Sequence, residues 1–205
     1  MKVAVVGGTG DFGLALAQRL VEAGDHVVIG SRDADRAREK ASEAGAFDGA
    51  ANADAVRDVD LVVLAVKAEA ALSTAEELAG AIGATPVLSV ASELRFTKTG
   101  VHPTAGGRSI AERTQELLDA PVVAGLHSLA ASSLAGGKAD GDALVCGDDA
   151  AAKDLALRLA AKIVAGRALD AGPLSSARAL EGMTAVIVNL NRRYKGHAGV
   201  RIVGL

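Results

Sequence analysis

The sequence VAVVGGTGDFG at residues 3–13 decides the fold of this chain. An apolar run leads into Gly8, Gly10 and Gly13, which have the Gly-x-Gly-x-x-Gly spacing of a dinucleotide-binding turn. We expect Gly8 to allow the tight turn, Gly10 to let the backbone approach a pyrophosphate, and Gly13 to let a helix pack on the strand. The helix expected over residues 11–23 would direct its free N–H groups at the phosphates. The segment therefore predicts a dinucleotide site; the alternative is a Rossmann-like scaffold that has lost its ligand.

The second expected strand ends in HVVIGSR at residues 26–32 and indicates which dinucleotide binds. An NAD site places a carboxylate at the end of this strand, where it binds the ribose 2′-hydroxyl. This chain has Ser31 and Arg32 there, which can hydrogen-bond and pair with a 2′-phosphate. Arg36, one helical turn further, and Thr9, inside the glycine turn, could reach the same phosphate. The pattern predicts NADP; the alternative for Arg32 and Arg36 is a solvated helix start.

The composition limits the possible partners and the compartment. Half of the 205 residues are apolar, aromatic residues make up 2%, and the net charge is −3. Few aromatics and no large basic patch disfavour nucleic acid as a partner. The single cysteine, Cys146, excludes an internal disulfide and is read as a small buried residue in a reducing compartment. No signal peptide and no membrane-length apolar run are visible, so we expect a cytoplasmic protein.

Strand and helix patterns alternate along the chain and predict an α/β, Rossmann-type doubly wound parallel sheet with a small C-terminal helical or edge extension. Residues 1–125 would form the dinucleotide-binding domain, and residues 126–205 would complete the site and a dimer interface within one compact unit. Residues 93–108 have poor periodicity and are expected to form a long loop over the carboxyl edge of the sheet. Residues 199–205 are expected to be an edge strand or a tail packed on a pocket. After the strand at 26–29, strands are expected at residues 61–66, 86–90, 122–126, 143–146 and 167–169, and helices at residues 33–44, 68–81, 109–118, 150–163 and 174–194.

The side chains that could react are few, because hydride chemistry belongs to a bound coenzyme rather than to the protein. The sequence contains no catalytic triad and no metal-ligand spacing among its histidines. His127 follows the strand at 122–126, at the edge where such sheets bind ligands. It could hydrogen-bond a ligand carbonyl or phosphate and so orient a ring, or it could cap the strand end or the next helix. A basic cluster near the C-terminus, spanning residues 192–201, could attract an acidic ligand or simply complement a helix end.

The whole chain resembles the NADP-dependent reductases of coenzyme F-420, an 8-hydroxy-5-deazaflavin. The matching segments are VVGGTGDFG, IGSR, LHSLAA, VCGDD at residues 145–149, LDAGPLSSARALE at residues 169–181, and NLNRRYKG. The resemblance implies an enzyme that catalyses reversible hydride transfer between the nicotinamide of NADP(H) and the deazaflavin. It implies that His127, Leu129 and Leu205 face the deazaflavin, and that Thr9, Ser31, Arg32 and Arg36 hold the 2′-phosphate. It also implies a homodimer paired through the C-terminal helix, with Met183, Val186, Ile187 and Leu190 on the apolar face.

Some positions depart from the pattern of that family and leave the second substrate open. Lys67 and Ala68 stand where the family often has proline and a bulky aromatic residue, and Ala130 stands where it often has proline. The alternatives are an NADPH-dependent reductase of another flavin, a metal chelate or a small imine, and a catalytically silent NADP(H)-sensing module. The complete expected coenzyme-binding set is Gly8, Thr9, Gly10, Asp11, Phe12, Gly13, Ser31, Arg32, Arg36, Val66, Lys67, Ala91, His127, Leu129 and Leu205, with no metal ligand.

Overall fold

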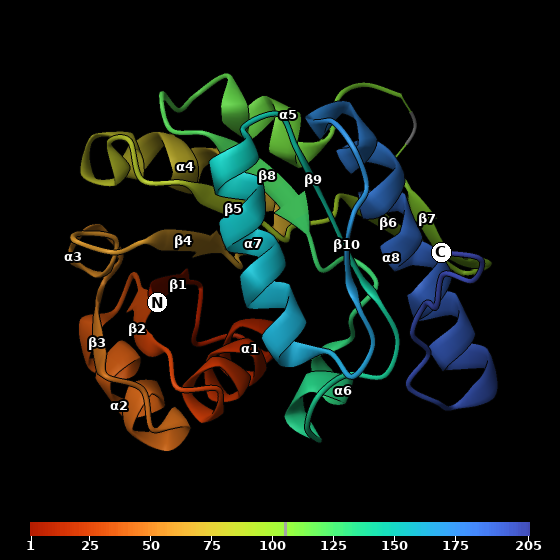
Figure 1. Ribbon diagram of the computed structural model, residues 1–205, viewed down its shortest axis with the longest axis horizontal. Helices are drawn as coiled ribbons and strands as arrows, with labels where there is room; N and C mark the ends of the chain where they lie inside the picture. Colours follow the sequence, from red (N-terminus) through yellow and green to blue (C-terminus); the bar gives the residue numbers. More distant parts are fainter. Residues whose placement is uncertain (105) are drawn as a thin grey trace.

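The computed structural model describes residues 1–104 and 106–205 and places an eight-stranded sheet between two layers of helices (Figure 1). The strands lie in the order β10-β9-β8-β5-β4-β1-β2-β3. They are β1 (Lys2–Val6), β2 (His26–Ser31), β3 (Asp48–Ala51), β4 (Leu61–Leu64), β5 (Val87–Ser89), β8 (Val122–Gly125), β9 (Ala143–Gly147) and β10 (Ala168–Asp170). The helices are α1 (Asp11–Glu22), α2 (Ala34–Ala44), α3 (Asn52–Ala55), α4 (Ala68–Ile82), α5 (Ile110–Gln115), α6 (Ala131–Ala135), α7 (Ala150–Ile163) and α8 (Ala177–Tyr194). The expected doubly wound α/β fold is confirmed.

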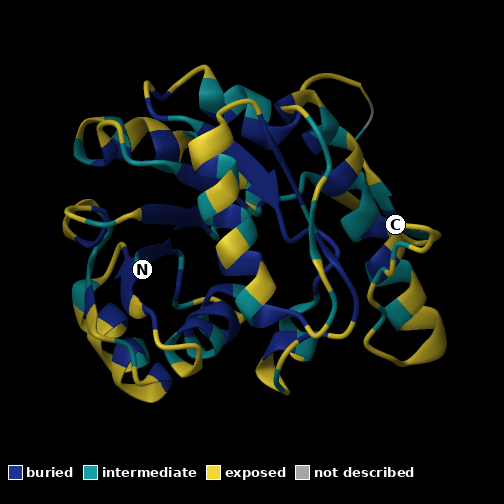
Figure 2. Ribbon diagram, viewed as in Figure 1, coloured by how far each residue is buried: buried dark blue, intermediate teal, exposed yellow. Residues whose placement is uncertain are grey.

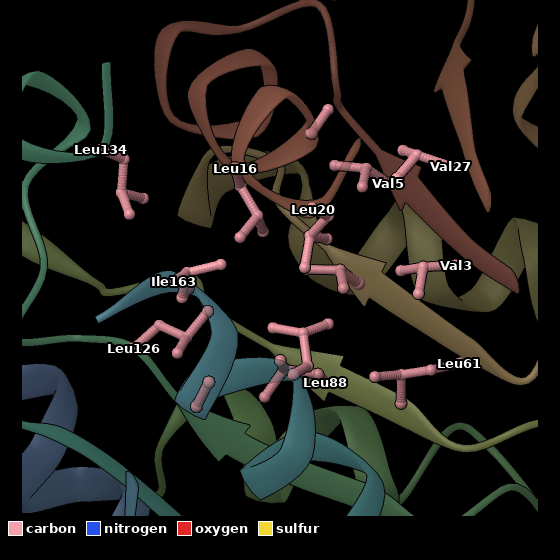
Figure 3. Close-up of a cluster of buried hydrophobic side chains, with 14 of the residues drawn as sticks. Val3, Val5, Leu16, Leu20, Val27, Leu61, Leu88, Leu126, Leu134 and Ile163 are labelled. Atoms are coloured by element: carbon pink, nitrogen blue, oxygen red, sulfur yellow. The ribbon is translucent and has the colours of Figure 1, made fainter. Parts of the chain in front are cut away.

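Alternation along β1 explains why helices cover both faces of the sheet. Val3 and Val5 point to the face covered by α1, α2, α6 and α7, where they join Leu16 and Leu20 in one buried cluster (Figure 3). Ala4 and Val6 point to the opposite face, which α4, α5 and α8 cover. A strand that is buried on both faces has a continuous apolar sequence, and for this reason β1 could be predicted from the sequence. Figure 2 shows the strands buried and the outer helix faces exposed.

The sheet departs from the expected parallel arrangement at one pair of strands. β9 runs antiparallel to β8, with Cys146 opposite Ala124, and parallel to β10. This pair is the exception in the predicted parallel sheet: the connection from β8 to β9 carries only the five-residue helix α6, which is shorter than a usual crossover helix. The short edge strand β3 was also missed, since its sequence DGAA carries no apolar run.

The segment over residues 93–108 is more ordered than expected. It contains an antiparallel hairpin of β6 (Leu94–Thr97) and β7 (Gly100–Pro103), which lies beside α8 (Figure 1). The prediction of an uninterrupted loop is wrong, because four-residue strands are too short for a clear period of two. Residue 105, within the expected loop, lies outside the described residues. The capping box predicted at the start of α5 is confirmed: Ser109 accepts from the Glu112 backbone N–H, and Glu112 accepts from the Ser109 N–H.

The C-terminal segment folds back as an irregular tail rather than as an edge strand. A single 3₁₀ turn at Leu174–Ser176 precedes α8, and the tail after it crosses the loop that precedes β9. The buried carboxylate of Asp142 holds this tail, since it accepts from the Ile202 backbone N–H at 2.8 Å and from the Arg167 guanidinium at 3.0 Å. The Arg167 backbone N–H donates to the same carboxylate at 2.8 Å, and it and these two hydrogen bonds lower the pKa of Asp142 to about 2. Among the described residues no helix is both long and apolar enough to span a bilayer.

Candidate active site at the carboxyl edge of the sheet

The glycine turn after β1 is positioned by Gly7 rather than by Gly8. Gly7 has a φ of +81°, and a Cβ atom on it would lie 2.7 Å from the carbonyl oxygen of Ala65, after β4. The expected turn role of Gly8 therefore belongs to its neighbour, because only Gly7 adopts the left-handed region. Gly8 is still constrained, since a Cβ there would lie 2.8 Å from the Val5 carbonyl oxygen. The turn thus sits between the ends of β1 and β4, where the strand order reverses and α/β sheets bind ligands.

The structure requires glycine at position 13 but not at position 10. A Cβ on Gly13 would lie 2.6 Å from the Gly7 carbonyl oxygen, so α1 can approach the turn only with glycine there. A Cβ on Gly10 would have only one neighbour, at an ordinary 3.5 Å. The packing of the protein therefore does not require glycine at position 10, which is exposed at the start of α1. Open backbone at a helix N-terminus fits the close approach of a pyrophosphate.

The end of β2 is joined to the glycine turn by one carbonyl group. The Gly30 carbonyl oxygen accepts from the N–H groups of Gly7 at 3.1 Å and Gly8 at 3.3 Å. The next residue, Ser31, is buried and its Oγ accepts from the Asp33 N–H, while Arg32 is exposed.

Asp33 then caps α2, accepting from the backbone N–H groups of Asp35 and Arg36. Neither Arg32 nor Arg36 is ion-paired within the described residues, so both guanidinium groups remain available to an anion beside the turn.

A cavity of about 750 Å³ opens next to this turn, at the carboxyl edge of the central strands. Six of the expected coenzyme-binding residues line it: Phe12, Val66, Lys67, Ala91, His127 and Leu129. The remaining lining residues are Ala65, Ala68, Glu69, Val90, Ser92, Glu93, Leu94, Phe96, Leu126 and Thr184. Leu205 is not among them: it is 85% exposed, and its carbonyl oxygen accepts from Arg167. The structure therefore brings most of the expected ring-binding residues together, but not Leu205.

His127 is held in one orientation at the back of the cavity. Its Nε2 lies 3.2 Å from the Ala91 carbonyl oxygen, which can only accept, so Nε2 carries the proton. Its Nδ1 is then a buried acceptor, and it has no partner among the described residues. Burial lowers the pKa of His127 to about 4, so the ring is neutral at physiological pH. The preceding Leu126 has a φ of +66°, an unusual conformation that turns the chain at the strand end.

Thr184 and Ser92 were missed by the sequence reasoning, although both line the cavity. Thr184 Oγ1 donates to the His127 carbonyl oxygen at 3.0 Å and lies 2.8 Å from Ser92 Oγ. The two hydroxyls come from α8 and from the segment after β5, so they join the C-terminal helix to the site. Single hydroxyl residues carry no spacing signal, and no motif could have identified them.

The remaining reactive groups are structural. Cys146 is buried in β9, and burial raises the pKa of its thiol to about 12, as expected of a small core residue. Within residues 1–104 and 106–205, no three side chains of His, Cys, Asp or Glu gather as metal ligands.

Fold and site together define a Rossmann-type dinucleotide-binding oxidoreductase. Residues 2–93 match the family described as NADP oxidoreductase, coenzyme F-420-dependent. Over its full length the chain is 36% identical to the F-420-dependent NADP reductase of Methanothermobacter marburgensis, covering 99% of that relative. It is 34% identical to the F-420-dependent NADP reductase of Methanocaldococcus jannaschii, again over 100% of this chain and 99% of the relative. A solved structure from an Arthrobacter species has a TM-score of 0.85 and 25% identity, covering 100% of this chain and 99% of that one. The chain belongs to the family of F-420-dependent NADP oxidoreductases.

Proposed function

We propose that this protein catalyses reversible hydride transfer between NADP(H) and the deazaflavin coenzyme F-420. The observation that carries the proposal is the position of the cavity of about 750 Å³ beside the glycine turn. The other side of this turn is flanked by Arg32 and Arg36, which have no ion-pair partner among the described residues. Relatives that match this chain over its full length are named F-420-dependent NADP reductases. The protein is then an NADP-dependent oxidoreductase with two small-molecule redox coenzymes as substrates.

The residues around the turn fit the nucleotide part of NADP. Gly8, Gly10 and Gly13 would hold the pyrophosphate against the start of α1, with Asp11 as its first residue. Thr9, Ser31, Arg32 and Arg36 would hold the 2′-phosphate, as expected from the sequence. The open backbone at Gly10, where the fold itself leaves room for a side chain, supports this assignment.

The cavity residues would hold and shield the reacting rings. When bound, the two coenzymes supply the chemistry, a hydride passing between nicotinamide C4 and deazaflavin C5. Val66, Ala91 and Leu129 provide apolar walls that exclude water from the reacting atoms. The bare Nδ1 of His127 would accept a hydrogen bond from a ring or amide N–H and so orient one of the rings. This replaces the donor role first considered for His127, because Nε2–H is already used by Ala91.

Mixing the protein with NADPH and oxidised F-420 tests the proposal. Loss of the deazaflavin's visible absorbance is expected, and no loss between pH 5 and pH 9 would contradict it. Other flavins, metal chelates and cyclic imines belong in parallel assays, since a preference for one of them would identify a different reductase. Tight NADPH binding without turnover of any acceptor would instead indicate a sensing module.

A homodimer through α8 belongs to the same proposal. Val186, Leu190 and Tyr194 are exposed and recur every four residues along one stripe of the helix. Ile187, also expected on this face, is buried within the subunit and cannot contact a partner. Light scattering should show a dimer mass, and the Leu190→Glu variant should shift it toward the monomer. A wild-type monomer at micromolar concentration would contradict the dimer.

We also propose that the N-terminal and C-terminal parts of the chain bind different coenzymes. Residues 1–125 would bind the nucleotide and residues 126–205 would complete the deazaflavin side, with both parts contributing strands to one sheet. A cytoplasmic location accords with the single, buried, free thiol of Cys146.

A further inference from the structure

The hairpin β6–β7 is a separate element that reaches the cavity from outside the central sheet. Its second strand is fixed to α8 by Asn189, whose Nδ2 donates to the Val101 carbonyl at 2.7 Å. Asn189 Oδ1 in turn accepts from the Val101 N–H at 2.9 Å. Gly100, with a φ of +140°, would place a Cβ only 2.9 Å from the same amide. The hairpin lies beside α8 (Figure 1), and the side-chain amide forms the pair of hydrogen bonds that a neighbouring strand would otherwise supply.

The base of the hairpin is anchored as well. Thr104, directly after β7, donates from its N–H and its Oγ1 to the carbonyl oxygen and carboxylate of Glu93, directly before β6. The Arg178 guanidinium of α8 donates to the Thr104 carbonyl oxygen. With both the base and one edge bonded, the side chains on the hairpin have defined positions.

One face of β6 is directed at the cavity. Leu94 and Phe96, two residues apart on a strand, share that face and both line the cavity. Phe96 is nevertheless 63% exposed. The chain contains only three phenylalanines, and two of them, Phe12 and Phe96, line this one cavity. A benzyl group held over an open cavity gains free energy when a flat apolar ring covers it.

Arg192 holds the ring of Phe96 from the α8 side. Its guanidinium carbon lies 5.5 Å from the ring centroid, which is the range of a cation–π contact. This contact covers part of the ring with a residue of α8, which also carries the cavity residue Thr184. It accounts for one of the cations of the C-terminal basic cluster.

We infer that Phe96 binds the ring of the second substrate, the hydride acceptor, and that Arg192 is its positioning residue. The two coenzymes would reach the cavity from different sides. The nicotinamide nucleotide comes from the glycine turn, against Phe12 of α1 and Val66 after β4, whereas Phe96 is contributed by the hairpin. The inference rests on the proposed function, because it assigns a contact within the proposed deazaflavin site.

The variants Phe96→Ala and Phe96→Leu test this contact. With saturating NADPH, the KM for the deazaflavin is expected to rise about tenfold in F96A and about threefold in F96L, which keeps bulk but loses the flat face. Calorimetric titration of the deazaflavin into the protein with bound NADP⁺ should show the same increases in Kd. The KM for NADPH should stay within about twofold, because the nucleotide would bind from the glycine turn, against Phe12 and Val66, rather than against the hairpin.

Matched variants separate a specific contact from a general effect. Phe47 is 68% exposed and stacked on His26, outside the residues that line the cavity, so Phe47→Ala should leave both coenzyme constants unchanged. Arg192→Gln should weaken deazaflavin binding about twofold to threefold, Arg192→Lys should restore most of it, and Arg193→Gln should have no effect.

Three outcomes would overturn the inference. The first is a deazaflavin Kd in F96A equal to that in F47A. The second is an equal loss of NADPH affinity, and the third is a shift of F96A toward monomer mass, which would place Phe96 in a subunit interface. If the wild type bound the deazaflavin without reducing it, the proposed function would fall, while the calorimetric comparison would still decide the role of Phe96. Absence of deazaflavin binding by the wild type would overturn both.

Discussion

The backbone N–H of Gly7 donates to the carbonyl oxygen of Gly30 at 3.1 Å, joining the glycine turn after β1 to the end of β2. The segments proposed to bind the pyrophosphate and the 2′-phosphate are therefore hydrogen-bonded to each other. One carbonyl group sets the distance between them, and Ser31 and Arg32 follow it directly in the chain. We therefore expect coenzyme selectivity to depend on this backbone geometry as well as on side-chain charge.

Replacing Arg32 with alanine should weaken NADPH binding by about 1.5–3 kcal/mol, the range for hydrogen bonds to charged groups, and should leave NADH binding nearly unchanged. Equilibrium titration of both coenzymes measures this. Arg38 lies on α2, the helix that follows Arg32, and is already paired with Asp35; it provides the control, and Arg38→Ala should change neither affinity. An equal loss for NADPH and NADH would remove the 2′-phosphate role from Arg32.

Alanine at Gly10 and at Gly13 should produce opposite kinds of defect. Gly10→Ala should fold with a free energy of unfolding within about 0.5 kcal/mol of wild type, yet bind NADPH at least about tenfold more weakly. Gly13→Ala should lose about 1–3 kcal/mol of folding stability, since its Cβ would meet the Gly7 carbonyl oxygen at 2.6 Å. Urea denaturation and coenzyme titration of both variants separate the two effects. Normal NADPH binding by G10A would contradict the pyrophosphate site.

His127 should make the protein less stable in acid. Its pKa of about 4 in the folded state lies below the ordinary value of 6.5, so protons bind the unfolded chain first as the pH falls. The contribution of neutral His127 to the free energy of unfolding is fully present above pH 6.5. It is lost as the pH falls through 4, by an amount on the order of 3 kcal/mol. His127→Gln, which can still donate to Ala91, should lack this part of the pH dependence. Unfolding curves of both proteins that run parallel from pH 7 to pH 4 would show that His127 is not buried as neutral imidazole.

Glu181 should produce the opposite dependence. It is buried on α8, its Oε1 accepts from the Ala111 N–H at the start of α5, and burial raises its pKa to about 7. A carboxyl group with a raised pKa favours folding at low pH, and this contribution is lost as the pH rises from the ordinary 4.5 through 7, by on the order of 3 kcal/mol. Glu181→Gln should flatten the stability of the protein between pH 5 and pH 8, as measured by denaturant unfolding. If the free energy of unfolding of E181Q changed with pH as steeply as that of the wild type, groups other than Glu181 would cause the pH dependence.

Two kinds of element could be predicted from the sequence: those with a regular pattern of apolar residues, and those at which only certain residue types fit sterically. The apolar strands β1 and β4 and the helix after the glycines are of this kind, as are Ser31 and Arg32 at the strand end. The sequence could not show whether Gly7 or Gly8 makes the turn, because two adjacent glycines are equally compatible with it. Only the positive φ of Gly7 distinguishes them.

Long-range features of the site were not predictable for a different reason. Thr184 reaches His127 across 57 residues, and Phe96 is placed at the cavity by a hairpin that Asn189 and Arg178 bond to α8. Contacts between residues so far apart in the chain produce no local sequence pattern from which they could be predicted. The antiparallel β9 was also missed, since its apolar residues are compatible with either strand direction.

Direct hydride transfer between two coenzymes that share one cavity can be measured by isotope transfer. NADPH carrying deuterium at both C4 positions is mixed with the protein and oxidised F-420 in ordinary water, and the reduced deazaflavin is analysed by NMR. If the hydride passes directly, the product carries one deuterium at C5, whichever nicotinamide face reacts. Reduced deazaflavin that carries only solvent hydrogen at C5, or no reduced product at all, would contradict it.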